Sequence, residues 1–185
     1  MKLTLPTVLT LFRIVLIPVL VLVYYLPQSW SNEVVVAIFI AAALTDWADG
    51  WIARKYQMMS PFGAFLDPVA DKLIVAIALI LIVQRHPELI ITLSAAVILG
   101  REITISALRE WMAELGQRAV VKVSNIGKSK TIFQMVAIGF LLYGEPLFGL
   151  PVLEIGIALL VISAVLTIWS MIIYLRSAWP AIRGE

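Results

Sequence analysis

Long apolar runs alternate with short polar connections along this chain. Several runs approach the roughly 20 apolar residues that a membrane helix needs, and they are continuous rather than alternating between apolar and polar positions. Because hydrocarbon offers the backbone no hydrogen bonds, such runs favour α-helices. We predict an all-α, polytopic membrane protein with six transmembrane helices, over residues 7–26, 33–56, 65–83, 88–111, 128–143 and 151–175.

Composition supports a membrane protein. The chain has 185 residues, of which 62% are hydrophobic and 14% are charged, and its mean hydropathy is +1.00. A soluble domain of this size has too little interior for so much apolar surface. No linker divides the sequence, so we predict a single membrane domain over residues 1–185, surrounded by membrane lipids and without a nucleic-acid partner. The lack of cysteine excludes disulfide and thiolate chemistry.

The distribution of basic residues predicts which ends of the helices face the cytoplasm. If the N-terminus is cytoplasmic, Arg85 alone lies on the opposite side, and every other lysine and arginine lies on or toward the cytoplasmic side. Positively charged loops remain in the cytoplasm, so both termini are predicted to be cytoplasmic. The acidic stretch described next then opens at the cytoplasmic face.

All four aspartates of the chain, Asp46, Asp49, Asp67 and Asp71, lie between two apolar runs. On helices, the first two share a face because they are three residues apart, and the last two because they are four apart. A carboxylate in hydrocarbon is unfavourable by roughly 2.5 to 3.5 kcal/mol, so four of them need a cationic partner. If the two helices pack as a hairpin, the carboxylates converge on a site for a hard cation such as Mg²⁺ or Mn²⁺.

Small residues and an arginine accompany these aspartates. Gly50 and Ala53 lie about one helical turn from the first pair, and Gly63 lies one turn before Asp67. Arg54 offers a fork of donors that suits a phosphate group. Together these residues predict a pyrophosphate site. A second interpretation of Arg54 is that it stabilises the end of its helix, where a cation suits the helix dipole.

Residues 100–131 carry more charge than any other part of the chain. Arg101 and Arg109 are eight residues apart and therefore share a helix face, and Lys128 and Lys130 lie at the start of the fifth predicted helix. These four residues are candidates to bind the phosphate of an anionic, water-soluble substrate. The alternative is that they are ordinary cytoplasmic anchors in contact with lipid headgroups.

The acidic stretch resembles the CDP-alcohol phosphotransferase family at all eight fixed positions of its signature, which here reads Asp46-x-x-Asp49-Gly50-x-x-Ala53-Arg54, eight further residues, and Gly63-x-x-x-Asp67-x-x-x-Asp71. The resemblance implies six membrane helices, an active site at the cytoplasmic face and two divalent ions, Mg²⁺ or Mn²⁺. It implies that Asp46, Asp49 and Asp67 are the principal metal ligands, and that Asp71 completes the second site and accepts a proton. The residues implied to bind the CDP-linked lipid are Thr10, Arg13, Asp49, Gly50, Ala53, Arg54 and Gly63.

Longer segments resemble the members of this family that use glycerol phosphate, namely PTVLTLFRIVLIP, TDWADGWIAR, FGAFLDPVADK, REITISALREWMAELG and GKSKT. The implied reaction joins CDP-diacylglycerol to sn-glycerol 3-phosphate and gives phosphatidylglycerol phosphate and CMP. The resemblance also implies a homodimer in the inner (cytoplasmic) membrane of a bacterium. The acceptor's phosphate would then be held by Arg101, Arg109, Lys128 and Lys130.

Other functions are consistent with parts of this pattern. The same family includes enzymes whose acceptor is inositol phosphate, serine or phosphatidylglycerol, and the basic segment favours an acceptor with a phosphate over serine. A divalent-cation transporter would also place acids in membrane helices, but along the depth of the bilayer rather than on one hairpin. A non-catalytic anchor protein would leave four convergent aspartates unexplained.

Overall fold

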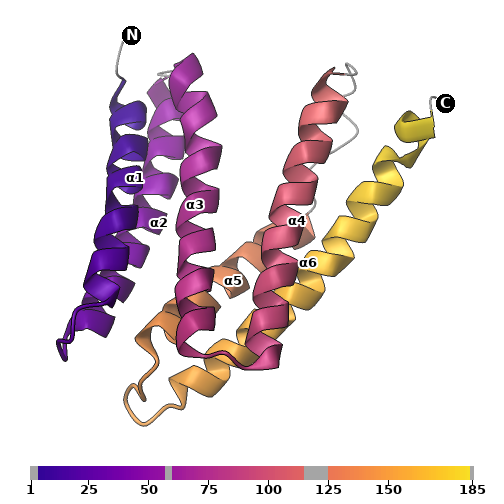
Figure 1. Ribbon diagram of the computed structural model, residues 1–185. Helices are drawn as coiled ribbons and strands as arrows, with labels where there is room; N and C mark the ends of the chain where they lie inside the picture. Colours follow the sequence, from indigo (N-terminus) through magenta and orange to yellow (C-terminus); the bar gives the residue numbers. More distant parts are fainter. Residues whose placement is uncertain (1–3, 57–59, 115–124, 184–185) are drawn as a thin grey trace. The chain divides into compact units, whose positions relative to one another are not determined.

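The structure is a computed structural model that describes residues 4–56, 60–114 and 125–183 (Figure 1). These residues form six helices: α1 (Leu5–Tyr24), α2 (Ser31–Tyr56), α3 (Pro61–Arg85), α4 (Leu89–Glu114), α5 (Asn125–Tyr143) and α6 (Val152–Arg183). Apart from an isolated bridge between Leu147 and Leu150, the described residues contain no β-structure. The all-α prediction is confirmed, and each helix overlaps its predicted range.

α3 and α6 extend furthest beyond the apolar runs that predicted them. α3 begins at Pro61 rather than at residue 65, because the Ser60 hydroxyl caps its first turn and accepts a hydrogen bond from the Gly63 backbone N–H at 3.0 Å. Proline suits the first helical position, where its missing N–H would have no partner. α6 continues past the predicted end at residue 175 to Arg183, although its last segment contains Pro180.

Four helices are long and apolar enough to cross a membrane: α1, α2, α4 and the part of α6 from Val152 to Ser177. α5 has a shorter apolar part, Lys130–Tyr143, and the first half of α3 contains charged residues. Large apolar side chains remain exposed on the four long helices, and such surfaces are suited to lipid rather than water. Examples are Leu22, Ile40, Leu93, Ile103, Val165 and Ile172.

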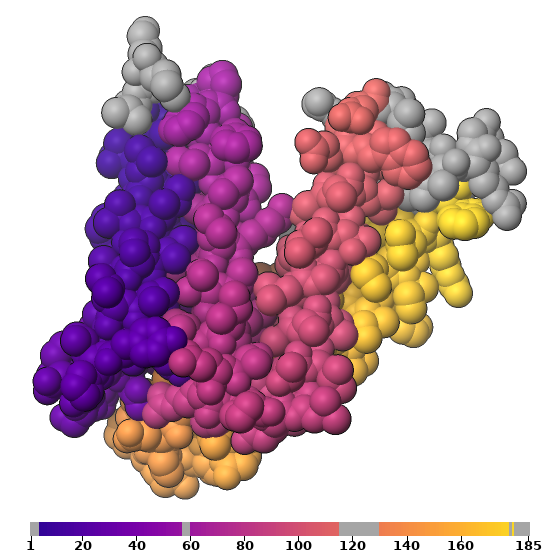
Figure 2. Space-filling model, in the orientation of Figure 1, coloured from indigo at the N-terminus to yellow at the C-terminus, as the bar shows by residue number. Residues whose placement is uncertain are grey.

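The chain divides into two compact units, of which the first comprises Met1–Ile82 and Leu141–Val152. α1, α2 and α3 run antiparallel in turn, so the start of α1, the end of α2 and the start of α3 lie together (Figure 1). At the other end, the Tyr24 hydroxyl donates to the Leu81 carbonyl oxygen at 2.9 Å. α1 packs closely against α2, and in the space-filling view the indigo surface of α1 adjoins the purple surface of the helices next to it (Figure 2). The apolar core of this unit includes Leu20, Val35, Phe39, Ile74, Leu79 and Ile82.

The second unit comprises Val83–Phe140 and Leu153–Glu185, and it contains α4, most of α5 and most of α6. Ile105, Leu108 and Met112 of α4 form a buried cluster with Tyr174 of α6. Between α5 and α6, the Ser163 hydroxyl donates to the Lys130 carbonyl oxygen at 3.5 Å. This packing places Arg101 and Arg109 of α4 next to Tyr174, as described below.

Candidate active site

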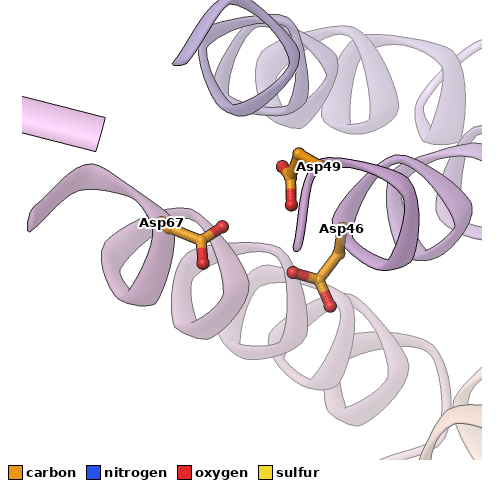
Figure 3. A group of neighbouring side chains, drawn as sticks. All are labelled: Asp46, Asp49 and Asp67. Atoms are coloured by element: carbon orange, nitrogen blue, oxygen red, sulfur yellow. The ribbon is translucent and has the colours of Figure 1, made fainter. Parts of the chain in front are cut away.

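Three aspartates from two helices converge in the first unit (Figure 3). Asp46 and Asp49 of α2 and Asp67 of α3 each offer one carboxylate oxygen, and these oxygens lie within 4.8 Å of one another. Asp49 is buried, with 3% of its side chain exposed, whereas Asp46 and Asp67 are 44% and 39% exposed. The cluster therefore has a buried floor and an open side.

Arg13 of α1 joins the fourth aspartate to this cluster. Its side chain is 1% exposed, and its Nη2 donates to Oδ2 of Asp49 at 2.5 Å. Its Nη1 lies 3.2 Å from Oδ1 of Asp46 and 3.3 Å from Oδ1 of Asp67. The same Nη1 is paired with Oδ1 of Asp71, which is 43% exposed. The four aspartates predicted to converge thus surround one guanidinium group from a third helix.

The oxygen donors of this cluster fit a hard divalent cation. Carboxylate oxygens are the ligands that Mg²⁺ and Mn²⁺ prefer, and Asp46, Asp49 and Asp67 are close enough together to bind one ion jointly. The four carboxylates carry a formal charge of −4 when ionised, and Arg13 reduces it only to −3. This excess of negative charge favours the binding of a cation.

A pocket adjoins the buried side of the cluster. Its lining comes from α1, α2, α3 and the residues just before α1 and α3, and consists of Thr4, Pro6, Thr7, Thr10, Asp49, Gly50, Ala53, Ser60, Gly63, Ala64 and Asp67. It therefore contains the three small residues of the signature together with Thr10 and two of the aspartates. Arg13 and Arg54 are not part of this lining: Arg13 lies among the carboxylates, and the Arg54 side chain is exposed and folds over Gly50.

The two pocket glycines also serve the packing of the protein itself. A Cβ atom at Gly63 would lie 2.7 Å from Oγ1 of Thr7 and 3.0 Å from Oγ of Ser60, so α1 and α3 can approach closely here only because the side chain is absent. At Gly50 a Cβ atom would lie 3.3 Å from Nη1 of Arg54, which is the end of a flexible side chain and can move. The stricter steric demand is therefore at Gly63.

Sequence analysis missed three hydroxyl groups of this pocket. Oγ1 of Thr7 lies 2.9 Å from Oγ1 of Thr4 and 2.9 Å from Oγ of Ser60, and this chain of hydroxyls links α1 to α3. The predicted Thr10 donates to the Pro6 carbonyl oxygen at 3.0 Å and to Asp49 Oδ2 at 3.4 Å. The spacing of the polar residues was the available signal, since a polar residue recurs at every third position and faces the same side of the helix, at Thr4, Thr7, Thr10 and Arg13.

In the second unit, two predicted basic residues share one carboxylate. Nη1 of Arg101 donates to Oε1 of Glu102 at 2.8 Å, and Nζ of Lys130 donates to the same oxygen at 3.2 Å. Both basic side chains are largely buried, with 10% of Arg101 and 4% of Lys130 exposed. Nε of Arg101 is buried and has no hydrogen-bond partner among the described residues. One carboxylate therefore balances two buried cations incompletely.

Arg109 lies near this group but makes a different contact. Its guanidinium carbon is 5.7 Å from the centre of the Tyr174 ring, and that of Arg101 is 5.6 Å from the same centre, so the two arginines flank one buried ring. The side chain of Arg109 is exposed. The fourth predicted residue, Lys128, is in α5, but its side chain lies outside the described part of the structure.

Comparison with known proteins agrees with this geometry. Residues 3–169 match the CDP-alcohol phosphatidyltransferase family. The CDP-diacylglycerol–glycerol-3-phosphate 3-phosphatidyltransferases of Escherichia coli (strain K12) and of Shigella flexneri serotype 5b (strain 8401) are both 53% identical to the chain over 178 residues, which is 96% of this chain and 96% of each relative. A match that covers most of the chain and includes every residue of the carboxylate cluster shows that this protein belongs to the CDP-alcohol phosphatidyltransferase family.

Proposed function

We propose that this protein transfers the phosphatidyl group of CDP-diacylglycerol to sn-glycerol 3-phosphate, giving phosphatidylglycerol phosphate and CMP. The observation that carries this proposal is the 53% identity, over nearly the whole chain, to relatives named for that reaction. The carboxylate cluster and its adjoining pocket supply a physical basis, because they combine a cation site with a cavity lined by small residues. A cation transporter is less well supported, since the aspartates gather on one pair of helices.

The metal ligands in this proposal are Asp46, Asp49 and Asp67, with Asp71 completing a second site, and the ions are Mg²⁺ or Mn²⁺. When bound, a pair of such ions would stabilise negative charge on the attacking and leaving oxygens. Arg13 contacts all four carboxylates and holds their oxygens toward a common centre.

The donor CDP-diacylglycerol would bind in the pocket beside the cluster. Gly50, Ala53 and Gly63 line it without bulky side chains, which leaves room for the nucleotide against the helices. Arg54 and Arg13 supply guanidinium groups for the pyrophosphate, and Thr10 holds Asp49 by a hydrogen bond. The acyl chains would remain in the bilayer, in keeping with the exposed apolar side chains of the long helices.

The proposed reaction is a displacement at the phosphorus that carries the diacylglycerol group. A hydroxyl oxygen of glycerol 3-phosphate bonds to this phosphorus, and the bond between the phosphorus and the CMP oxygen breaks. The hydroxyl proton passes to a carboxylate oxygen of Asp71. Asp71 suits this role because its side chain is 43% exposed and can therefore meet an entering acceptor.

The acceptor's phosphate would bind Arg101, Arg109, Lys128 and Lys130 in the second unit. Arg101 has donors to spare, since only its Nη1 contacts Glu102 and its Nε is unpaired among the described residues. Arg109 is exposed and offers its guanidinium group beside Tyr174. A phosphate would restore the charge balance that Glu102 leaves incomplete.

In the membrane, we place both termini and the carboxylate cluster on the cytoplasmic side, with all six helices spanning the bilayer and both compact units within one family domain. We expect the compartment to be the bacterial inner (cytoplasmic) membrane, and this expectation is supported by the four long apolar helices and by the bacterial origin of the relatives. We expect a homodimer. Accessibility of single engineered cysteines in a chain that has none of its own would test this orientation directly.

A CMP-release assay tests the proposed function. Purified protein in detergent receives CDP-diacylglycerol with glycerol 3-phosphate, inositol phosphate, serine or phosphatidylglycerol in separate reactions, each with Mg²⁺ or with a chelator. We expect CMP only with glycerol 3-phosphate and only with Mg²⁺. Release of CMP only with another acceptor would show that glycerol 3-phosphate is not the acceptor. Release of CMP in the presence of the chelator would show that the reaction does not require a divalent ion.

A further inference from the structure

We propose that Arg13 competes with divalent ions for the carboxylate cluster and thereby couples metal binding to the arrival of the anionic donor. A single nitrogen, Nη1, lies within ion-pair distance of oxygens of Asp46, Asp67 and Asp71. That nitrogen thus sits where carboxylates of two helices converge. A cation that bridged the same oxygens would occupy the same position, so Arg13 and that cation exclude each other there.

The charges explain why the competition depends on the donor. With Arg13 in place the ionised cluster has a formal charge of −3, so a first divalent ion leaves −1 and a second one would make the site positive. The pyrophosphate of the donor brings two negative charges and removes this excess. A second ion should therefore bind weakly to the protein alone and tightly when a pyrophosphate is present.

The contacts of Arg13 allow one part of its guanidinium group to leave the carboxylates while the other part stays bound. Its Nη2 is held by the buried Asp49, whereas the partners of its Nη1 are all partly exposed. Its Nε is buried and has no hydrogen-bond partner among the described residues, so no further contact holds the guanidinium in place there. The guanidinium can therefore stay anchored at Asp49 while Nη1 gives up the exposed carboxylates.

The first experiment measures Mn²⁺ binding to the unmodified protein in detergent, by the electron paramagnetic resonance signal of the free ion, with and without CDP. We expect two ions per chain with CDP, and a rise in affinity for the weaker ion on the order of tenfold or more when CDP is added. Equal affinities and equal numbers of ions in the two titrations would overturn the proposal.

Variants of Arg13 then assign the effect to this side chain. Arg13→Gln should raise the affinity for Mn²⁺ in the absence of CDP by about tenfold or more, because a cation has been removed from the cluster, and should reduce the enhancement by CDP. Arg13→Lys retains the charge but cannot reach Asp49 and the other carboxylates together. Its affinity for Mn²⁺ without CDP should therefore lie between those of the unmodified protein and Arg13→Gln. Weaker binding of Mn²⁺ alone in both variants would show that Arg13 merely orients the carboxylates, and would overturn the competition.

Lys55→Gln is the control, because it removes an exposed cation at the end of α2 whose Nζ lies over the Trp51 ring and contacts none of the four carboxylates among the ion pairs given above. Its effect on Mn²⁺ binding without CDP should stay below about threefold, because an exposed charge is well screened. If Arg13→Gln does not fold, Arg13→Lys and the first experiment still decide the question. The inference rests on the proposed function for its donor, but the titrations contain no acceptor, so they can fail while CMP release succeeds, and the reverse.

Discussion

The two polar clusters of this protein have opposite charge balance. In the first unit, one buried cation, Arg13, lies among four carboxylates, whereas in the second unit one carboxylate, Glu102, lies between the two buried cations Arg101 and Lys130. Each cluster contains one internal counter-ion that holds it together but does not neutralise it. The remaining charge indicates the ligand, which is a cation in the first unit and an anion in the second. The predictions below test this contrast.

The largest effect is expected from the carboxylate cluster. Asp67→Asn removes a charge at the point where the oxygens of three aspartates converge, so CMP release should fall by roughly a thousandfold or more, which corresponds to about 4 kcal/mol of transition-state stabilisation. Steady-state kinetics at saturating Mg²⁺ would measure it. Glu33→Gln, an exposed acid in the first turn of α2, is the control and should retain full activity. A similar loss in both variants would mean that general electrostatics, not the cluster, determines the rate.

A substitution at the basic cluster should change the KM for the acceptor rather than the rate of turnover. Arg109→Ala removes an exposed guanidinium beside Tyr174, so the KM for glycerol 3-phosphate should rise by about tenfold while the KM for CDP-diacylglycerol stays unchanged, as expected when a charged hydrogen bond to one ligand is lost. Arg176→Ala, an exposed arginine on α6, should leave both constants unchanged. Equal changes in the two KM values for Arg109→Ala would contradict the separate anion site.

Replacing a glycine by alanine should lower stability in the first unit but not in the second. Gly63→Ala should lower stability by about 1 to 3 kcal/mol, because its Cβ atom would lie 2.7 Å from the Thr7 hydroxyl. Gly139→Ala in α5 meets nothing within 4 Å and should be neutral or slightly stabilising. Thermal unfolding in detergent compares the two variants. Adding Thr7→Ala to Gly63→Ala should recover part of the loss, and the lack of any recovery would show that this hydroxyl is not what Gly63 accommodates.

The smallest effect is expected at a single hydroxyl. Thr10→Val removes the hydrogen bond to Asp49 at 3.4 Å, so turnover should fall by about fivefold, in keeping with roughly 1 kcal/mol for one long hydrogen bond. Thr104→Val in α4 removes only a bond to the Gly100 carbonyl oxygen and should not affect turnover. Kinetics at several Mg²⁺ concentrations would locate the effect, which should be largest when Mg²⁺ is limiting. An unchanged rate in Thr10→Val would show that the Thr10 hydroxyl does not contribute to turnover.

Much of the fold and part of the site followed from local patterns. Hydrophobic runs predicted six helices, and the spacing of Asp46, Asp49, Asp67 and Asp71 predicted which carboxylates share a helix face. Polar ends of helices were less predictable, since the start of α3 depends on a cap at Ser60 and not on apolar residues. The remaining predictions, for the acceptor site and the membrane orientation, await the experiments above.

The sequence by itself determined which side chains share a face of each helix, because residues three or four apart lie on the same side of a helix. Only the tertiary structure decided which other helix supplies the side chain that contacts each of these faces. Arg13 meets Asp49 and Asp71 across 36 and 58 residues of chain, and Thr7 meets Ser60 across 53. Contacts over such separations depend on how whole helices pack, and no local pattern encodes them. The counter-ion of the carboxylate cluster, Arg13, is therefore a property of the fold.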